Sequence, residues 1–528
     1  MDYHPTMGLE IHVELKTNSK MFCSCKNDPD EKSPNLNICP ICMGHPGTLP
    51  VINKEAVRKV IRTALALNCE IQKRTHFERK NYFYPDLPKG YQISQYSAPL
   101  SKNGYLEPSL KNEKVKVERI HLEEDTGKLI HPEKTDYSLI DFNRAGIPLM
   151  ELVTEPDIHS SQEAREFVRE LQLILRYLGV SDADMEKGEM RVEVNISLKS
   201  QKSKVKSQKL GTKVEIKNLN SLRAVEKSIE YEIKRQKEIL EKGESVVQET
   251  RGWLDEATAS SRRVAGARVD ENKEITISQR EKEEAHDYRY FPEPDLPPLN
   301  LNDEFLKEIK TEIPELPQER RRRFEKEYKL DKKTIEVLIF NKELGEYFEK
   351  VTSELVVWVV DELRSSSPFA IARVKDEKKK LKVTEEEFKK LAKLTSNYIL
   401  TDLQGLLKGS SVKSKNFLIT PENFAEFISL IYMNEISSKI AKTLLKEMFD
   451  KGTDPSQIMA EKKLSLISDE TELEKIIKEV LNKNPKPAED YKKGKETALQ
   501  FLIGQVMART KGKASPEMVN KILKKLLS

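Results

Sequence analysis

Cysteine and histidine are missing from much of this 528-residue chain. All five cysteines lie at or before Cys69, and all eight histidines lie at or before His286. Thiolates and imidazoles are the usual protein ligands of Zn²⁺ and other borderline metals, so a site built from them is excluded from the C-terminal part. Metal and imidazole chemistry is therefore expected only in the first part of the sequence.

Long apolar runs are missing too. No stretch approaches the roughly 18 apolar residues that a membrane span requires. The N-terminus does not have the basic segment followed by an apolar one that a secretory signal contains. Five cysteines, four of them in two close pairs, fit a reducing compartment better than a disulfide framework. We therefore expect a cytoplasmic protein.

Three common nucleotide-binding and nucleophile motifs are also absent. The sequence has no G-x-x-x-x-G-K-[ST] phosphate loop, no G-x-G-x-x-G after a strand pattern and no G-x-S-x-G nucleophile elbow. Any use of ATP must therefore depend on a site of another kind. The overall charge indicates no partner, because 91 Lys and Arg against 87 Asp and Glu leave a formal net charge of only +4.

The hydrophobic pattern of the N-terminal part mixes two periods. Alternation predicts strands at 9–15 and 192–198, and helical spacing predicts helices over 53–68, 160–179 and 221–243. We expect these helices to flank an antiparallel sheet.

Proline marks the first change in pattern along the chain. Four prolines between Phe291 and Pro298 predict an extended connector, beyond which the pattern is helical. A softer boundary follows in the Gly/Ser/Lys stretch at 405–414, and the lysine-rich stretch at 200–209 is interpreted as a solvated hairpin loop. The expected fold class is α+β, with an antiparallel-sheet domain at 1–298, an all-helical domain at 299–408 and a helical tail domain at 409–528.

The clearest local motif consists of two close cysteine pairs. Cys23-Ser-Cys25 is followed, after thirteen residues, by Cys39-Pro-Ile-Cys42. This spacing is typical of a zinc knuckle in which four thiolates hold one tetrahedral Zn²⁺. Such a site has no open coordination position, so we expect structural Zn²⁺; unrelated buried thiols or a redox pair are the alternatives.

Acidic residues recur on the predicted strands and at their ends. On the first strand, two carboxylates share one face with an imidazole, and further acidic residues follow on or after other strands: Glu10, His12, Glu14, Glu123, Glu124, Asp125, Glu151, Glu193 and Glu215. If these strands are neighbours, the carboxylates converge, and such clusters commonly hold Mg²⁺ or Mn²⁺. The alternative is that a few of 87 acidic residues fall on outer strand faces by chance.

Basic residues gather at the C-terminus. From Tyr491 to Ser528 the chain has nine Lys or Arg and two Glu. Four of these lysines are predicted to contact RNA phosphates, namely Lys511, Lys513, Lys521 and Lys524. An ordinary solvated face is the alternative.

Several long blocks resemble one known family, the GatB family of aspartyl/glutamyl-tRNA(Asn/Gln) amidotransferase subunits. In the first 300 residues the blocks are Gly8–Lys16, Arg79–Ser94, His121–Asp125, Asn143–Glu151, Lys217–Ser221 and Asp287–Asp295. Looser similarity continues to the end through Leu418–Glu422, Ser437–Ala441 and Gly504–Met507.

This resemblance implies a cradle-shaped N-terminal domain, a helical domain and a tail domain similar to the YqeY family, which meets tRNA. It also implies a carbon–nitrogen ligase. ATP phosphorylates the side-chain carboxylate of Glu-tRNA(Gln) or Asp-tRNA(Asn), and ammonia then displaces the phosphate. The ammonia would come from a separate amidase subunit, and a small third subunit would complete a heterotrimer. A non-catalytic, zinc-stabilised tRNA-binding protein is the alternative function.

The resemblance also assigns site residues. His12, Glu124 and Glu151 would hold the principal Mg²⁺, whereas Glu10, Glu193 and Glu215 would serve a second, nucleotide-associated ion. Glu193 departs from the family pattern, where Asp is frequent, and the stretch at 365–382 is longer than the family leads us to expect. The sequence leaves open which misacylated tRNA is the substrate and which metal is bound.

Overall fold

The structure is a computed structural model that describes residues 3–108, 114–132, 135–200, 210–254, 274–281, 288–365, 384–462, 470–510 and 513–527. It divides into two compact units, Met1–Pro317 and Gln318–Ser528. The predicted lysine-rich loop at 201–209 and the predicted insertion at 366–382 lie outside the described residues. No helix in the described ranges has both the length and the apolar character needed to cross a membrane.

A nine-stranded sheet forms the centre of the first unit. Its strand order is β14-β13-β12-β11-β1-β10-β7-β6-β2, and all neighbours pair antiparallel except β12 and β13. The strands are β1 (Tyr3–Glu14), β2 (Glu70–Ile71), β6 (Ser101–Leu106), β7 (Val115–Glu124), β10 (Pro148–Thr154), β11 (Met190–Ser200), β12 (Val214–Leu219), β13 (Glu249–Leu254) and β14 (Ile275–Glu281). The predicted antiparallel sheet and α+β class are confirmed.

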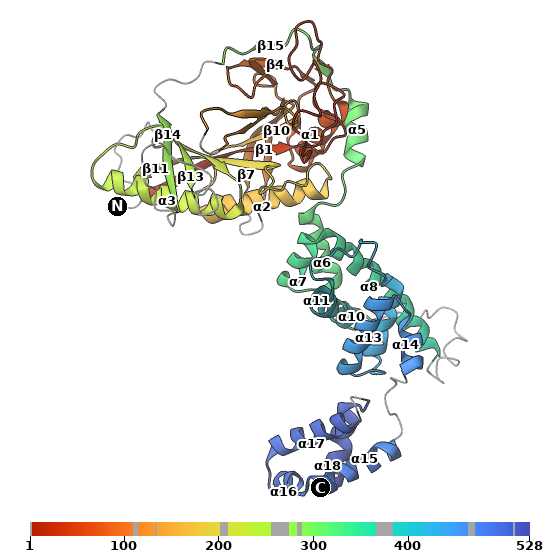
Figure 1. Ribbon diagram of the computed structural model, residues 1–528. Helices are drawn as coiled ribbons and strands as arrows, with labels where there is room; N and C mark the ends of the chain where they lie inside the picture. Colours follow the sequence, from red (N-terminus) through yellow and green to blue (C-terminus); the bar gives the residue numbers. More distant parts are fainter. Residues whose placement is uncertain are drawn as a thin grey trace. The chain divides into compact units, whose positions relative to one another are not determined.

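The two faces of this sheet differ because side chains alternate along each strand. On β1, Leu9, Ile11 and Val13 lie in the hydrophobic core, whereas Glu10 and His12 are only partly buried on the other face. Three helices contribute to the same core: α1 (Lys54–Ala66), α2 (Ser161–Tyr177) and α3 (Leu222–Glu241). Figure 1 shows α2 and α3 running along one face of the sheet. The apolar residues thus face the helices and leave the polar residues for a site on the opposite face.

The three predicted helices are confirmed, and each begins at a capping side chain. Asn53 accepts hydrogen bonds from two backbone N–H groups at the start of α1, and Ser160 and Ser221 do the same for one N–H each at α2 and α3. These caps satisfy donors that have no partner within the helix. Beyond the end of α2, Gly179 has a φ of +63°, a left-handed conformation that glycine adopts without strain.

The proline-rich connector is extended, as predicted, but it belongs to the first unit. Part of it forms β15 (Phe291–Pro292), which pairs with β4 (Glu78–Asn81) next to β5 (Tyr91–Ser94). Two smaller ladders join β16 (Leu299–Asn300) to β3 (Arg74–Thr75) and β8 (Lys128–Ile130) to β9 (Leu139–Asp141).

The helix α5 (Asp303–Thr311) follows the connector and also packs on the first unit. Ile309 is fully buried in its core, and Arg58 on α1 forms ion pairs with Glu308 and Glu312. The first compact unit therefore extends to Pro317, beyond the domain boundary predicted at 298. The domain ranges derived from the sequence remain predictions.

The described part of the second unit is helical, as expected. Its elements are α6 (Pro317–Tyr328), α7 (Lys332–Phe340), α8 (Lys342–Ser365), α10 (Glu385–Tyr398), the π-helical turn η1 (Ile399–Leu403), α11 (Gln404–Leu407), α12 (Pro421–Tyr432), α13 (Ser438–Lys451), α14 (Pro455–Lys462), α15 (Glu470–Lys483), α16 (Pro485–Lys492), α17 (Glu496–Arg509) and α18 (Pro516–Leu527). A separate hydrophobic core joins α15, α17 and α18 through residues such as Leu473, Leu502 and Leu523. This core forms the helical tail that the sequence predicted.

Candidate active site and metal centres

Strand register brings the predicted polar residues of the sheet together. His12 on β1 lies directly opposite Glu151 on β10, and Glu151 lies opposite His121 on β7. On the other side of β1, Glu10 lies opposite Glu193 on β11. Because directly opposite residues of antiparallel strands point to the same face, these side chains form one polar cluster.

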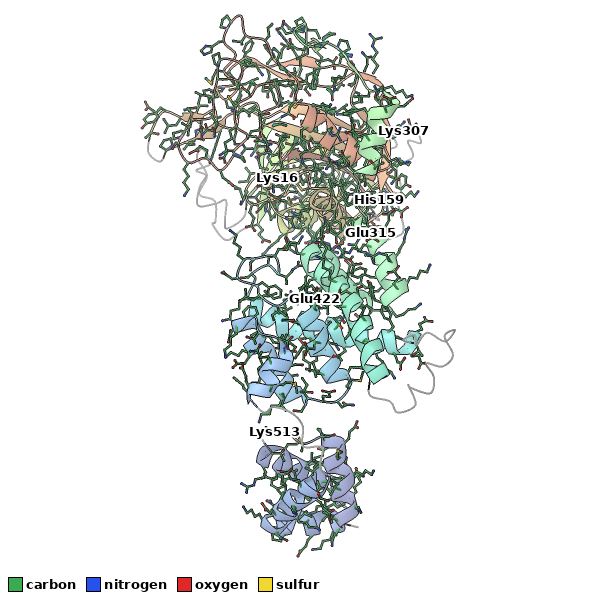
Figure 2. All side chains as sticks on the ribbon, turned by 90° about the vertical axis from the view of Figure 1, so that its right-hand side faces the viewer. Lys16, His159, Lys307, Glu315, Glu422 and Lys513 are labelled. Carbon is green, nitrogen blue, oxygen red and sulfur yellow. The ribbon has the colours of Figure 1, made fainter. Side chains whose placement is uncertain are left out.

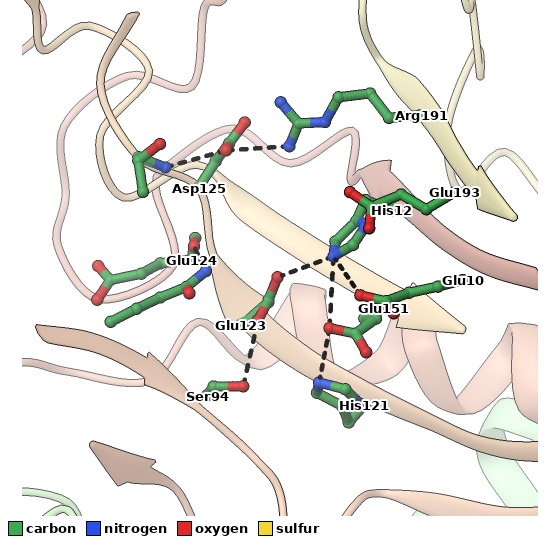
Figure 3. Close-up of polar contacts among 12 residues, drawn as sticks. Glu10, His12, Ser94, His121, Glu123, Glu124, Asp125, Glu151, Arg191 and Glu193 are labelled. Atoms are coloured by element: carbon green, nitrogen blue, oxygen red, sulfur yellow. Dashed lines mark hydrogen bonds and ion pairs between the residues drawn. The ribbon is translucent and has the colours of Figure 1, made fainter. Parts of the chain in front are cut away.

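The imidazole of His12 lies among three carboxylates (Figure 3). Its Nε2 atom is 3.4 Å from Glu151 Oε2, 3.6 Å from Glu123 Oε1 and 3.8 Å from Glu10 Oε1. His121 Nε2 lies 3.4 Å from Glu151 Oε2. Glu151, Glu123 and His121 are all buried, so this cluster is largely withdrawn from water.

Three overlapping groups in this cluster have ligand atoms within 4.8 Å of one another. They are Glu10, His12 and Glu151; His121, Glu123 and Glu151; and Glu10, Glu193 and Glu215. Carboxylate oxygens, with or without an imidazole nitrogen, are suitable ligands for Mg²⁺ and Mn²⁺. The donor set therefore fits divalent cations, and Glu10 and Glu151 are each shared by two of the groups.

The pKa values in the cluster show how strongly the groups interact. Burial acts to lower the pKa of His12, but the hydrogen bond and charge of Glu151 raise it to about 9. Burial acts to raise the pKa of Glu151, but the charge of His121 and the hydrogen bond from His12 hold it well below its usual range. Burial and the neighbouring Glu151 raise the pKa of Glu10. Carboxylates this close together are stabilised by positive charge from either side chains or ions.

Two lysines supply positive charge to the cluster. Lys217 on β12 lies 2.7 Å from Glu193 and 3.7 Å from Glu215. Burial acts to lower the pKa of Lys80 on β4, but the charge of Glu123 outweighs this effect and raises it. Both ammonium groups therefore remain protonated beside the carboxylates.

One predicted ligand, Glu124, is not part of these groups. Its carboxylate accepts hydrogen bonds from Lys89 and from the backbone N–H of Ile93, and Figure 3 shows it directed away from His12. Successive residues of a strand point to opposite faces, so Glu123 faces His12 and Glu124 does not. The structure thus brings together His12, Glu151, Glu10, Glu193 and Glu215, while the role of Glu124 remains a prediction.

Two members of the cluster are not identified as ligands by the sequence. Glu123 stands out there only as one of three acidic residues at a strand end, and His121 does not stand out at all. Both have the same parity on β7, and the pairing of His121 with Glu151 brings them to the polar face. The parity is visible in the sequence, but the strand pairing is not.

Asp125 is also acidic but is already paired. Its carboxylate accepts hydrogen bonds from Arg144 at 2.6 Å and from Arg191 at 3.1 Å. Arg144 also forms an ion pair with Glu14. Asp125 and Glu14 are therefore engaged by arginines at the edge of the cluster rather than available as metal ligands.

The four predicted zinc ligands lie together in the structure. One sulfur atom each from Cys23, Cys25, Cys39 and Cys42 lies within 4.8 Å of the others, and no disulfide joins them. The hydrogen bond from Cys23 contributes most to a lowered pKa of Cys42, about 5. Four convergent thiols, one with a low pKa, match the ligand set of a structural zinc site.

A buried lysine accompanies the cysteine group. Lys20 is fully buried, and its Nζ atom lies 3.9 Å from Cys42 Sγ and 3.2 Å from the carbonyl oxygen of Phe142. A buried ammonium group needs a compensating negative charge or strong acceptors. The nearby thiolate of Cys42 can supply that charge.

The predicted tail lysines are described in part. Lys521 and Lys524 are exposed on α18, and Lys513, marked in Figure 2, precedes that helix and is half-buried. Lys511 lies outside the described residues. The exposed face of α18 therefore carries positive charge, as predicted.

Comparisons with known proteins identify the family. Residues 5–307 match a family model described as the GatB/GatE catalytic domain, and residues 370–527 match one described as the GatB domain. The chain is 46% identical to a protein of Persephonella marina over the full length of both, and 46% identical to one of Thermotoga maritima over all of this chain and 99% of that protein. A protein of Carboxydothermus hydrogenoformans is 44% identical over the same shares. All three are named as the B-type subunit of aspartyl/glutamyl-tRNA(Asn/Gln) amidotransferase. The chain therefore belongs to the GatB family of aspartyl/glutamyl-tRNA(Asn/Gln) amidotransferase subunits, whose members form one part of a multi-subunit ligase.

Proposed function

We propose that this protein converts the side-chain carboxylate of glutamate on tRNA(Gln), of aspartate on tRNA(Asn), or of both into an amide. The carboxylate oxygen attacks the γ-phosphorus of ATP, ADP leaves, and an acyl phosphate forms. Ammonia then attacks the acyl carbon and phosphate leaves, giving Gln-tRNA(Gln) or Asn-tRNA(Asn). The convergence of His12 and several carboxylates on one sheet face is the observation that carries this proposal.

The ligand groups suggest two ion positions. His12, Glu151 and Glu10 would hold one Mg²⁺, while Glu193 and Glu215 with Glu10 would hold a second one next to the nucleotide. Mg²⁺ bound there would neutralise charge on the phosphates during phosphoryl transfer. Glu124, which the family resemblance places at the first ion, would join it only after leaving Lys89.

The remaining residues of the site support this chemistry. Lys80 and Lys217 keep positive charge next to the carboxylates, and both are suited to bind phosphate oxygens of the nucleotide. The burial of Glu123 and Glu151 excludes water from the cluster. Exclusion of water protects an acyl phosphate from hydrolysis before ammonia reaches it.

Zn²⁺ would have a structural role. The four cysteine thiolates fill its coordination positions, so no position remains for a substrate. Lys20 would offset part of the negative charge that four thiolates place around the ion.

The ammonia would come from a partner. The sequence has no nucleophile elbow for glutamine hydrolysis, so we propose that a separate amidase subunit supplies it and that a small third subunit completes a heterotrimer. The tail, through Lys511, Lys513, Lys521 and Lys524, would contact the tRNA backbone. We place this complex in the cytoplasm.

An amidation assay of the reconstituted complex tests the proposal. Each misacylated tRNA is supplied with ATP and either glutamine or free ammonium, and the amide product is measured. We expect His12→Ala to abolish amidation with both nitrogen donors, while tRNA binding persists. His159→Ala is the matched control, because His159 is an exposed histidine outside the cluster. Full activity of His12→Ala would refute the site, and no amidation by the native complex would favour a non-catalytic tRNA-binding protein.

A further inference from the structure

Tyr96 is an exposed aromatic residue on a rigid loop. Its side chain is 57% exposed, although it lies only two residues beyond β5. The backbone N–H groups of Tyr96 and Ser97 both donate to Glu78 Oε2 at 2.8 Å, and Ser97 Oγ donates to the other oxygen at 2.9 Å. Glu78 is itself buried. The loop therefore holds the tyrosine in place with hydrogen bonds to a buried carboxylate.

The neighbouring residue, Gln95, ties this loop to the central sheet. Its Nε2 donates to Thr75 Oγ1 at 2.8 Å, and its Oε1 accepts from the backbone N–H of Leu122 on β7 at 3.1 Å. On the other side, Ser94 Oγ donates to Glu123 Oε2 at 3.2 Å, a contact visible in Figure 3. Tyr96 therefore follows directly on a segment that contacts the carboxylate cluster.

A second tyrosine lies against Tyr96. The rings of Tyr96 and Tyr290 stack with centroids 4.6 Å apart and an interplanar angle of 9°. Tyr288 contacts Tyr290 edge-to-face at 6.0 Å, and Tyr82 contacts Tyr288 in the same way. The four rings form a continuous aromatic group made from three segments of the chain.

The segment that carries Tyr288 and Tyr290 is also held in a defined conformation. The side chain of Asn81 donates to the carbonyl oxygens of Tyr288 and Arg289, and its backbone N–H donates to Tyr288 as well. Arg289 has a φ of +46°, which is uncommon for a residue other than glycine. A strained backbone that is held by specific hydrogen bonds often marks a functional position.

Positive charge links the aromatic group to the metal-ligand cluster. Lys80 Nζ lies 5.1 Å from the ring centroid of Tyr288 and 6.0 Å from that of Tyr82. Lys80 also experiences the charges of Glu123 and Glu151. A flat ligand stacked on Tyr96 would therefore have its remaining atoms next to the site proposed for phosphoryl transfer.

We propose that Tyr96, supported by Tyr290, is a stacking platform for the adenine base of an adenosine-bearing substrate. This inference rests on the proposed function, in which two substrates present adenosine: ATP, and the tRNA, whose 3′ end terminates in adenosine. Stacking of a base on an aromatic side chain contributes about 1–3 kcal/mol. A pre-positioned ring loses little conformational entropy on binding, which makes a rigid, exposed tyrosine suited to this role.

Two binding measurements on the assembled complex test the platform and distinguish the two sources of adenosine. The first measures the dissociation constant of Mg²⁺-ADP. The second compares deacylated tRNA that has its terminal adenosine with tRNA trimmed of it. We expect Tyr96→Ala to weaken one of these interactions by about 5- to 150-fold, which corresponds to the loss of one stacked base. A change in the ADP arm assigns the platform to ATP, and a change only for untrimmed tRNA assigns it to the 3′ end.

Three further variants make the result specific. Tyr96→Phe retains the ring and should bind like the native chain, whereas Tyr96→Leu retains bulk without an aromatic face and should bind like Tyr96→Ala. Tyr137→Ala removes a tyrosine that is 56% exposed elsewhere and should change neither arm. Unchanged binding in both arms for Tyr96→Ala and Tyr96→Leu, with an unchanged melting temperature, would overturn the proposal. Because no turnover is required, a failure of amidation by the native complex would be seen separately.

Discussion

The imidazole Nε2 of His12 lies 3.4 Å from a carboxylate oxygen of Glu151, across the pairing of β1 and β10. The two residues are far apart in sequence, and only the strand register makes them neighbours. Glu151 belongs to two of the possible metal-ligand groups, so it connects the imidazole of β1 to that of β7.

Glu151→Gln tests this shared position. The substitution preserves the shape of the side chain but removes its charge, so we expect amidation with free ammonium to fall by at least about 100-fold. The rate is measured over a Mg²⁺ titration. Glu118→Gln, which removes an exposed carboxylate on β7, is the control and should retain activity. Native rates for Glu151→Gln would show that this carboxylate holds no essential ion.

Glu123 and Glu124 are neighbours in sequence but face different partners, so matched variants separate their roles. In a Mn²⁺ titration without substrates, we expect Glu123→Gln to weaken binding about tenfold or more, because its carboxylate faces His12. Glu124→Gln should bind Mn²⁺ like the native chain, because its carboxylate contacts Lys89 instead. The reverse result would show that Glu124 turns toward the ion and that Glu123 does not bind it.

The cysteine group is expected to hold one Zn²⁺ per chain, measured by elemental analysis. Cys39→Ser should lose the metal and lower the melting temperature, whereas Cys69→Ala, at a buried cysteine outside the group, should retain the metal. Lys20→Met should weaken Zn²⁺ about 10- to 100-fold in a chelator competition, because it removes positive charge next to Cys42. Equal zinc affinity of Lys20→Met and the native chain would exclude this role for Lys20.

The basic face of α18 is tested by the salt dependence of tRNA binding. If Lys521 and Lys524 each neutralise one phosphate, their joint replacement by Gln reduces the slope of log K against log salt concentration by about 1.4–1.8. The matched control is the joint replacement of Lys439 and Lys446, two lysines on α13 outside the tail helices, which should leave the slope unchanged. An unchanged slope for the α18 pair would mean that these lysines do not contact the tRNA.

Local features of the chain were predictable from the sequence because they depend on nearby residues. The alternation around Glu10 and His12 identified a strand with one polar face, since side chains of a strand point to opposite sides in turn. The spacing of the cysteine pairs brought four sulfur atoms within reach of one ion. The helices beginning after Asn53 and Ser160 were also recognisable, because capping side chains and helical spacing act over a few residues.

Only the tertiary structure decided which of these polar faces meet. The order of β11, β1, β10 and β7 brings together segments that are far apart in sequence, because pairing satisfies backbone hydrogen bonds while burying one apolar face. This register places Glu123 rather than Glu124 beside His12 and adds His121 to the cluster. It also draws the proline connector into the first unit through β15 and positions Tyr290 against Tyr96. The sequence by itself determined the kinds of chemical groups and the local elements that carry them, and long-range packing determined their partners.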